Sequence, residues 1–507
     1  MRAFGYRQFR IFWMACFVSQ ISFSMMLITR GWLVLKLTDS PFLVTAVTAI
    51  ALLPPSLAAP FTGVMADRFN RRTILIIGEI ATFVILLALS FLVLKELVQV
   101  WHVFVLSALG GMALAFSLPT RPAVVPTLVA SQDLVNGMAL YTTLISASMF
   151  VGPAMAGYII DARSIGAAIL TASLLLIPAV ALLLLLRLPK PMEGSDQASS
   201  RSILANLSEG LAYVMQRPAL VGIILLALAI AAFGSSYMTL LPVIARDILN
   251  VGPDGLGLLG AGAGIGALSG AFTVAFFNNS RRIKLLLFTS GLGIGPVLIL
   301  FALSSIFAVS LVMVFVVGAV LQIFYTTNIT MVQMASPNYI RGRVMGIRYI
   351  TMGAGTLGIL LLGFAAEVLN PIVALVLTGL FALVLIILIL VAIPELRHLR
   401  EPTSLSETSP TSTAAAPSPK LELEEAKPPL SSIATIALYV IGALGWLWAF
   451  ALFVAGSANL SSGFDSLGVS NRILLETASY LLIGVGPGVI VALLCGRALR
   501  RRRNRIY

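Results

Sequence analysis

Ten residues near the start of the chain carry a dense group of charges between two long apolar stretches. They read Gly63-Val-Met-Ala-Asp67-Arg68-Phe-Asn-Arg71-Arg72. A carboxylate and guanidinium groups form strong, directional hydrogen bonds, so they can join two parts of a protein in one state and release them in another. Basic residues alone would also orient membrane helices, but that role gives no reason for Asp67. We therefore predict that this segment acts as a gate.

Two more charges, Arg30 and Glu79, fall inside apolar stretches. Glu79 follows Arg72 by seven residues, which is about 10 Å along a helix. Such charges cost a few kcal/mol unless they face a cavity or a partner. Glu79 is therefore either a protonatable coupling site or a group that snorkels or pairs with a loop arginine. Arg30 either binds an anionic substrate group or a carboxylate, or it snorkels outward.

Polar and aromatic side chains in other apolar stretches are candidates for a substrate pathway near the middle of the membrane. Polar groups on membrane helices usually face the interior of the helix bundle. Hydrogen bonding between helices would explain the same residues equally well. The pathway candidates, with the two charges, are Gln20, Arg30, Glu79, Tyr237, Gln322, Tyr325 and Asn328.

Gly152-Pro153, with Gly157 one turn later, lies within another apolar stretch. Proline removes a helical hydrogen bond and kinks the helix, and glycine lets two backbones approach closely. Ordinary packing of membrane helices also uses both residues.

The composition predicts an all-α membrane protein. Hydrophobic residues make up 59% and charged residues 10% of 507 residues, and the mean hydropathy is +1.01. A soluble domain carries about 25% charged residues, and a membrane span needs about 20 apolar residues. The expected spans are 11–36, 41–66, 73–95, 101–120, 134–160, 165–186, 219–245, 255–278, 284–304, 307–334, 343–366, 371–393, 433–456 and 473–496.

The distribution of the 33 Lys and Arg residues predicts the orientation. Most fall in or next to alternate connecting segments, among them Arg121, whereas Lys36, Lys95, Arg163, Arg246 and Arg472 fall in the others. Positive charges favour the cytoplasmic side, so we expect both termini in the cytoplasm. We therefore attribute the net charge of +13 to the orientation of the helices in the membrane, and we expect no nucleic-acid partner.

Two blocks of the chain resemble each other. Arg71-Arg72 matches Arg281-Arg282, and 131–137 matches 336–342, in the same order. Parallel repeats of this kind occur in transporters. We expect bundles of six helices over 1–190 and 218–395, and a linker over 191–217 with a helix that lies on the inner leaflet or on protein. A disordered Pro/Ser/Thr-rich linker over 396–431 should lead to two extra membrane helices and a basic, lipid-binding tail over 432–507.

The sequence has no nucleotide-binding loop, no His/Cys metal cluster and no hydrolase triad. His102 and His398 are the only histidines, and they lie far apart. Cys16 and Cys495 both fall within expected spans, so they offer no disulfide framework. We therefore expect no enzyme, metal or cofactor.

The chain resembles the drug/siderophore-exporter branch of the major facilitator superfamily, which includes bacterial macrolide efflux proteins and the enterobactin exporter. The resemblance covers about residues 1–395. It depends on the segment 63–72, on Gly152-Pro153 with Gly157, and on Arg341-Gly-Arg343-Val-Met. Further matches are Leu37-Thr-Asp-Ser-Pro41, Pro119-Thr-Arg-Pro-Ala-Val-Val-Pro126 and Leu241-Pro-Val-Ile-Ala-Arg-Asp247.

The resemblance implies alternating access by two bundles, usually driven by an inward proton gradient, and a Gly-Pro motif in the fifth helix implies export rather than uptake. The helix expected over 101–120 has no arginine within 109–116, where many proton-driven drug antiporters have one, and Phe277-Asn278 replaces the Asp-Arg pair in the second block. The expected gating residues are Gly63, Asp67, Arg68, Arg71, Arg72, Gly152, Pro153, Gly157, Arg341 and Arg343.

We thus expect a monomeric transporter in a bacterial plasma membrane that exports a small amphipathic molecule. An importer or lipid-moving member of the same superfamily remains an alternative, because fold does not fix substrate or direction. A transport-inactive sensor or scaffold is another.

Overall fold

The computed structural model describes residues 2–68, 70–188, 203–277, 280–337 and 340–396, and within these ranges it contains helices and no strand. Within these ranges, the residues up to 212 and those of 222–391 belong to one compact unit, and 213–221 with 392–396 belong to a second. The contacts that build the site lie within the first unit. The predicted linker over 396–431, the two extra helices and the basic tail lie outside the described residues, apart from Leu396.

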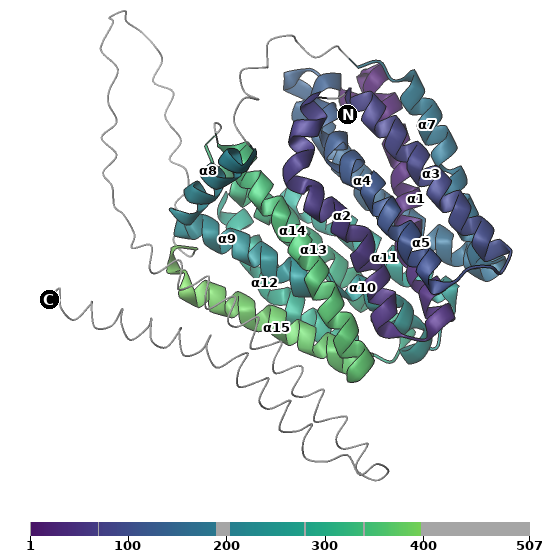
Figure 1. Cartoon of the computed structure of the whole chain (residues 1–507). Coiled ribbons are helices and arrows are strands. Elements are labelled where there is room, and N and C mark those ends of the chain that lie inside the picture. The colour runs from purple at the N-terminus through teal and green to yellow at the C-terminus, as the bar shows by residue number, and fades with distance from the viewer. Residues whose placement is uncertain (1, 69, 189–202, 278–279, 338–339, 397–507) are drawn as a thin grey trace, which may run out of the picture. The chain divides into compact units, whose positions relative to one another are not determined.

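Figure 1 shows the helices of the first block in purple and blue and those of the second in teal and green. The first block contains α1 (Arg7–Thr38), α2 (Pro41–Arg68), α3 (Arg71–Leu94), α4 (Val100–Leu128), α5 (Leu134–Ala162), α6 (Ile165–Leu174) and α7 (Leu176–Leu185). The second contains α8 (Ile203–Met215), α9 (Pro218–Ala229), α10 (Tyr237–Val243), α11 (Pro253–Phe276), α12 (Ser280–Ala302), α13 (Phe307–Met334), α14 (Arg341–Val368) and α15 (Pro371–Ala392). π-Helical turns at Ile230–Gly234 and Ile244–Ile248 flank α10, and short 3₁₀ helices occupy Arg2–Gly5, Ser131–Asp133 and Pro394–Leu396.

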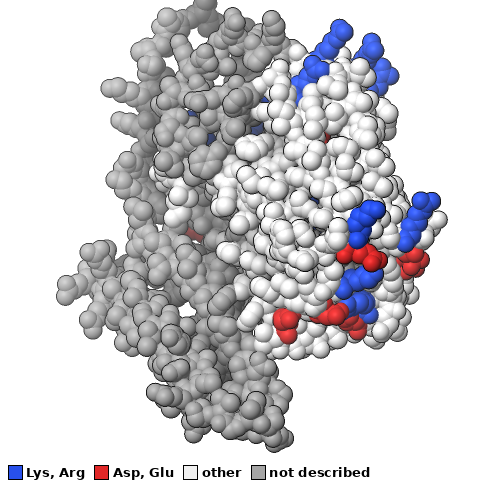
Figure 2. All heavy atoms as spheres, turned by 45° about the vertical axis from the view of Figure 1, so that its right-hand side comes forward, with Lys and Arg blue, Asp and Glu red and all other residues white. Residues whose placement is uncertain are grey.

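Eleven helical segments in the described ranges are long and apolar enough to cross a membrane. Figure 2 shows charged side chains gathered toward two ends of one face, with a band free of Lys, Arg, Asp and Glu between them. A bilayer requires such a band, because its hydrocarbon core cannot solvate charge. The prediction of a multi-pass helical membrane protein is therefore confirmed.

The fourth span differs from its predicted bounds. It was expected to end at 120, but α4 continues to Leu128 and has Pro119, Pro122 and Pro126 inside it. Membrane helices tolerate internal prolines because neighbouring groups satisfy the freed backbone atoms. The extension brings Arg121 into the helix, which decides the chemistry of the site.

The two blocks contact each other along α5 and α11 and along α2 and α14. On α11, Gly257 faces Gly157, Gly260 faces Pro153, and Gly264 faces the backbone of Met149 and Phe150. A Cβ atom at Gly157 would lie 2.5 Å from the carbonyl oxygen of Pro253 and 2.6 Å from the Cα of Gly257. Gly157 therefore allows α5 and α11 to pack closely, as the sequence suggested, because no larger residue fits between the two helices at this separation.

We predict that Gly157→Ala lowers the thermal stability of the protein. The added methyl group must push α5 and α11 apart, and overpacking of this kind typically costs about 1–3 kcal/mol. Gly346→Ala on α14 is the matched control, because a Cβ there would meet nothing within 4 Å. Thermal unfolding of both purified variants in detergent measures the difference, and equal midpoints would contradict the close contact.

Candidate functional site

A buried ion pair joins α3 to α4. The Arg121 Nη2 atom lies 2.7 Å from Glu79 Oε1, and each side chain is 6% exposed. The Ser19 hydroxyl of α1 lies 2.8 Å from both carboxylate oxygens of Glu79 and accepts a hydrogen bond from Arg121 Nη2 at 2.7 Å. Arg121 Nη1 also donates to Gln20 Oε1 at 3.1 Å. Three helices therefore meet in one polar network.

This network corrects two expectations. Arg121 was assigned to an inner connecting segment and the fourth helix was expected to lack an intramembrane arginine, but Arg121 is 5% exposed inside α4. Glu79 does not snorkel and does not bind a loop arginine; it binds Arg121. The apolar residues 122–129 that follow Arg121 were the available signal that the helix continues.

A cavity extends from this network along one face of α1. Its α1 lining is Ser19, Ser22, Phe23, Met26, Leu27 and Arg30, which recur at the spacing of a single helical face. Residues of α2, α3, α4 and α7 complete the wall, among them Thr48, Thr82, Gly110, Ser117 and Arg121. The space free of atoms is about 750 Å³, and this value includes space that is open to solvent.

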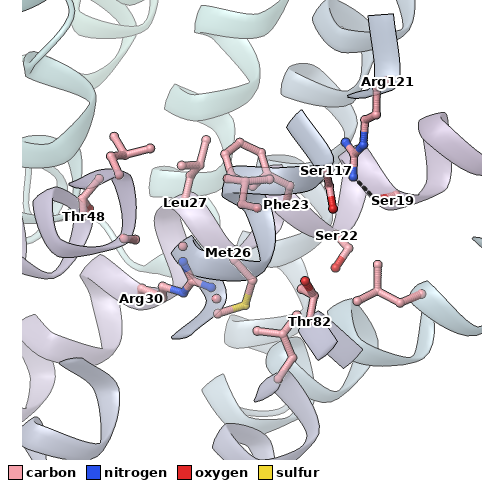
Figure 3. A pocket seen from close by; sticks show the side chains of 17 residues that line it. Ser19, Ser22, Phe23, Met26, Leu27, Arg30, Thr48, Thr82, Ser117 and Arg121 are labelled. Atoms are coloured by element: carbon pink, nitrogen blue, oxygen red, sulfur yellow. Dashed lines mark hydrogen bonds between the residues drawn. The ribbon is translucent and has the colours of Figure 1, made fainter. Parts of the chain in front are cut away.

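Arg30 lies at the other end of this cavity. Figure 3 shows Arg30 and Arg121 on opposite sides, with Met26, Phe23 and Ser22 between them. The Arg30 Nε atom is buried and has no hydrogen-bond partner among the described residues. Beside its guanidinium group, α4 has Gly110, where a Cβ would lie 3.5 Å from Nη2. The cavity is thus apolar in the middle and polar at both ends.

A second buried arginine lies in the other block. Arg348 is 2% exposed within α14, and it falls in the span expected over 343–366, although it was not singled out there as an intramembrane charge. Its Nε donates to Asn328 Oδ1 at 2.5 Å, and its guanidinium carbon lies 5.8 Å from the centroid of the Tyr325 ring. Asn328 Nδ2 donates to the carbonyl of Ile223 at 2.8 Å. Asn328 and Tyr325 therefore position Arg348.

The remaining pathway candidates lie apart from the cavity. Tyr237 is buried edge-on against Phe301, with centroids 6.2 Å apart. Gln322 donates to Thr326 on its own helix at 3.1 Å. The structure thus gathers Gln20, Arg30 and Glu79 at one site, and it places Tyr325 and Asn328 at another.

The expected gate is described only in part. Gly63, Asp67 and Arg68 lie in α2, but their side chains fall outside the described ones. Arg71 Nη1 donates to the Ala123 carbonyl at 2.8 Å, and Arg72 Nε donates to the Leu183 carbonyl at 3.0 Å, which ties the start of α3 to α4 and α7. Their gating role stays a prediction.

In the second block, Arg343 forms an ion pair with Glu209 of α8, and Arg341 Nε donates to the Ser336 carbonyl at 3.2 Å. Gly152 packs on α1, where a Cβ would lie 2.0 Å from Ser24 Oγ. The gating roles of these residues are likewise untested by the geometry.

Comparison with known proteins identifies the family. A family model described as transmembrane secretion effector matches residues 2–424. The chain belongs to this family. Its relatives place it in the efflux branch of the major facilitator superfamily, as the sequence motifs predicted.

Two curated relatives illustrate the branch of this transmembrane secretion effector. The enterobactin exporter EntS of Escherichia coli K12 is 24% identical over 344 residues, which cover 67% of this chain and 80% of EntS. Macrolide efflux protein A of Enterococcus faecalis is 24% identical over 250 residues, which cover 49% of this chain and 77% of that protein.

Solved structures share the fold. The nucleoside transporter NupG has a TM-score of 0.60 at 14% identity, and the match covers 76% of this chain and 98% of that chain. The peptide transporter POT in complex with sulfate has a TM-score of 0.62 at 15% identity, and the match covers 78% of this chain and 96% of that chain. The prediction of a major facilitator transporter fold is confirmed; the full count of helices stays a prediction.

Polar contacts also join the two blocks of this secretion effector at the end of the unit formed by residues 38–42, which we call the outer end. Arg246 Nη1 of the second block lies 2.6 Å from Asp39 Oδ1 of the first, while Arg246 Nε lies 2.5 Å from Oδ1 of Asp247, its neighbour within the second block. Glu367 Oε2 accepts hydrogen bonds from Ser40 Oγ at 2.9 Å and from the backbone N–H of Phe42 at 3.1 Å. Sequence reasoning missed these contacts because the partners lie in different blocks.

We predict that Glu79→Met and Arg121→Met each destabilise the protein strongly. Each change leaves a buried charge without its partner, which typically costs about 3–5 kcal/mol, whereas the double variant removes both charges and should recover most of the loss. The exposed pair offers a control: Asp247→Asn should cost about 0–1 kcal/mol. Thermal unfolding of the four variants measures the coupling, and additive losses in the double variant would argue against a direct pair.

Proposed function

We propose that this secretion effector is a secondary active exporter of a small amphipathic molecule and that proton entry drives it. The curated relatives are named as exporters of enterobactin and of macrolides. The observation that carries the proposal is the cavity along α1, which pairs an apolar middle with a buried carboxylate network at one end. A molecule with one apolar and one polar part suits such a wall.

We assign the binding of the coupling proton to Glu79. It is buried, it contacts Ser19 and Arg121 of the cavity wall, and Arg121 is the cation that balances its charge among the described residues. Protonation of Glu79 would remove that balance and free the Arg121 guanidinium and the Ser19 hydroxyl toward the cavity. The packing of α1 on α3 and α4 would therefore depend on the proton, which is what coupling requires.

Alternating access assigns a role to the outer end. While Arg246 binds Asp39 and Glu367 binds Ser40, this end holds the two blocks together. Release of the substrate on this side would require these contacts to break. They are exposed polar contacts, each worth about 0–1 kcal/mol, so their exchange between two states is cheap.

We predict that Glu79→Gln abolishes proton-driven transport but leaves substrate exchange. Glutamine keeps the size and a hydrogen-bonding oxygen but carries no exchangeable charge. A ligand-dependent thermal-shift screen first selects a transported compound, since binding raises stability progressively with ligand concentration. Proteoliposomes then report accumulation under an imposed pH gradient and counterflow without one.

Glu96→Gln, an exposed carboxylate just beyond α3, is the control and should transport normally. Inside-out vesicles fix the direction, because an exporter accumulates substrate inside them. Gradient-driven accumulation by the Glu79→Gln variant at the wild-type rate would exclude Glu79 as the coupling site.

We predict that a covalent bridge across the outer end stops transport. Ser40→Cys and Glu367→Cys are introduced together after Cys16 and Cys495 are replaced by serine, at the two positions whose side-chain oxygens are 2.9 Å apart. A cysteine is two bonds shorter than glutamate, so the two thiols are farther apart than the oxygens and need a cross-linker between them. A short, reducible thiol cross-linker should block flux, and a reductant should restore it. Each single-cysteine variant treated in the same way is the control, and full flux in the bridged protein would contradict alternating access at this end.

A further inference from the structure

Arg30 is a charge in a membrane-spanning helix for which the described part of the chain supplies no counter-charge. Its Nε is buried without a hydrogen-bond partner, and it forms no ion pair with any described carboxylate. A charge at such depth is costly unless a partner or a cavity accommodates it. Arg30 borders a cavity, so the missing negative charge has room to enter.

The opposite end of the cavity is already balanced. Glu79 neutralises Arg121, and Ser19 and Gln20 satisfy further hydrogen bonds there. The excess positive charge of the cavity therefore resides at Arg30. Thr48 lies on the same wall, and Gly110 leaves the space beside the guanidinium group free of a side chain.

The α1 wall in the middle of the cavity is mostly apolar. Phe23, Met26 and Leu27, with the small polar Ser22, separate Ser19 from Arg30, which are eleven residues or about 16 Å apart along α1. Methionine adapts its shape to varied apolar partners. A ligand that spans this wall would carry an apolar body and a negative group at one end.

We propose that Arg30 is the anchor for the carboxylate or a similar oxyanion of an amphipathic substrate, a proposal that rests on the proposed export function and names its substrate class. The planar guanidinium group binds such oxyanions through paired hydrogen bonds. With the anion bound, the cavity is electrically balanced. Outward movement of the anion and inward movement of a proton shift charge in the same direction, so an inside-negative membrane potential drives both.

The oxyanion has two possible sources, a free amphipathic acid or the headgroup of an anionic lipid. Both would use the same chemistry at Arg30. The protein is therefore placed in nanodiscs of phosphatidylcholine, and in a second arm in nanodiscs that also contain phosphatidylglycerol. If phosphatidylglycerol lowers the binding of the probe 2-naphthoate to the wild type but not to Arg30→Gln, the site belongs to a lipid headgroup. If phosphatidylglycerol does not lower this binding to the wild type, the site belongs to a free acid.

The test measures binding of radiolabelled 2-naphthoate and of its neutral amide, 2-naphthamide, by equilibrium dialysis. We expect the wild-type protein to bind the carboxylate about 10- to 100-fold more tightly than the amide, the range of a hydrogen bond to a charged group. Arg30→Gln should lose this preference, and Arg30→Lys should keep part of it. Lys36→Gln, an exposed charge at the end of the same helix, should bind as the wild type does.

Three results would overturn the assignment of Arg30. These are equal binding of the carboxylate and the amide by the wild type, no saturable binding of 2-naphthoate, or unchanged preference in Arg30→Gln. The first two need no variant. Arg30→Gln removes no described partner, so its unfolding midpoint without ligand should be equal or higher.

Binding in nanodiscs requires no proton gradient, so the binding test of the anion site can fail or succeed independently of the transport test of the export proposal. A protein that binds 2-naphthoate through Arg30 but moves no substrate refutes the export proposal alone. A protein whose proton-driven flux and naphthoate binding both survive Arg30→Gln refutes the anion site alone.

Discussion

The free-energy cost of placing a charge inside a bilayer determines how the buried charged side chains of this protein are paired, because hydrocarbon offers neither water nor counter-ions. Glu79 and Arg121 meet this cost by binding each other and Ser19. Arg348 meets it by binding Asn328 and stacking near Tyr325. The placement of α1 against α3 and α4 follows from the first of these networks, since its hydrogen bonds form only when the three helices meet.

That constraint also explains the shape of the cavity. The face of α1 that presents Ser19 to Glu79 continues through Ser22, Phe23 and Met26 to Arg30 by helical spacing. Once the hydrogen bonds of Ser19 and Gln20 to the ion pair hold the rotation of α1, Arg30 must border the same space. That Arg30 has no counter-charge among the described residues is therefore a consequence of a rotation that these hydrogen bonds stabilise.

The sequence predicted much of the fold because hydropathy, proline and charge are local properties. The apolar spans, the intramembrane position of Glu79 and the close packing near Gly157 could all be inferred. Arg121 was misplaced because the expected span ended at 120, whereas α4 continues through Pro122 and Pro126 to Leu128, as a membrane helix can when neighbouring groups satisfy the freed backbone atoms. The partner of Arg348 and the separation of Tyr237 from the cavity depend on helix rotation, which hydropathy leaves open.

Two different kinds of interaction hold the two blocks together. Along α5 and α11, glycines bring the backbones together, and such contacts depend on van der Waals packing rather than on hydrogen bonds. At the outer end, Asp39, Arg246 and Glu367 form exposed polar contacts that water can replace at little cost. A transporter needs two states of similar free energy. In the alternating-access cycle that we propose, contacts that water can replace at one end, combined with close packing along the helices, would let the blocks part there without exposing an unpaired buried charge.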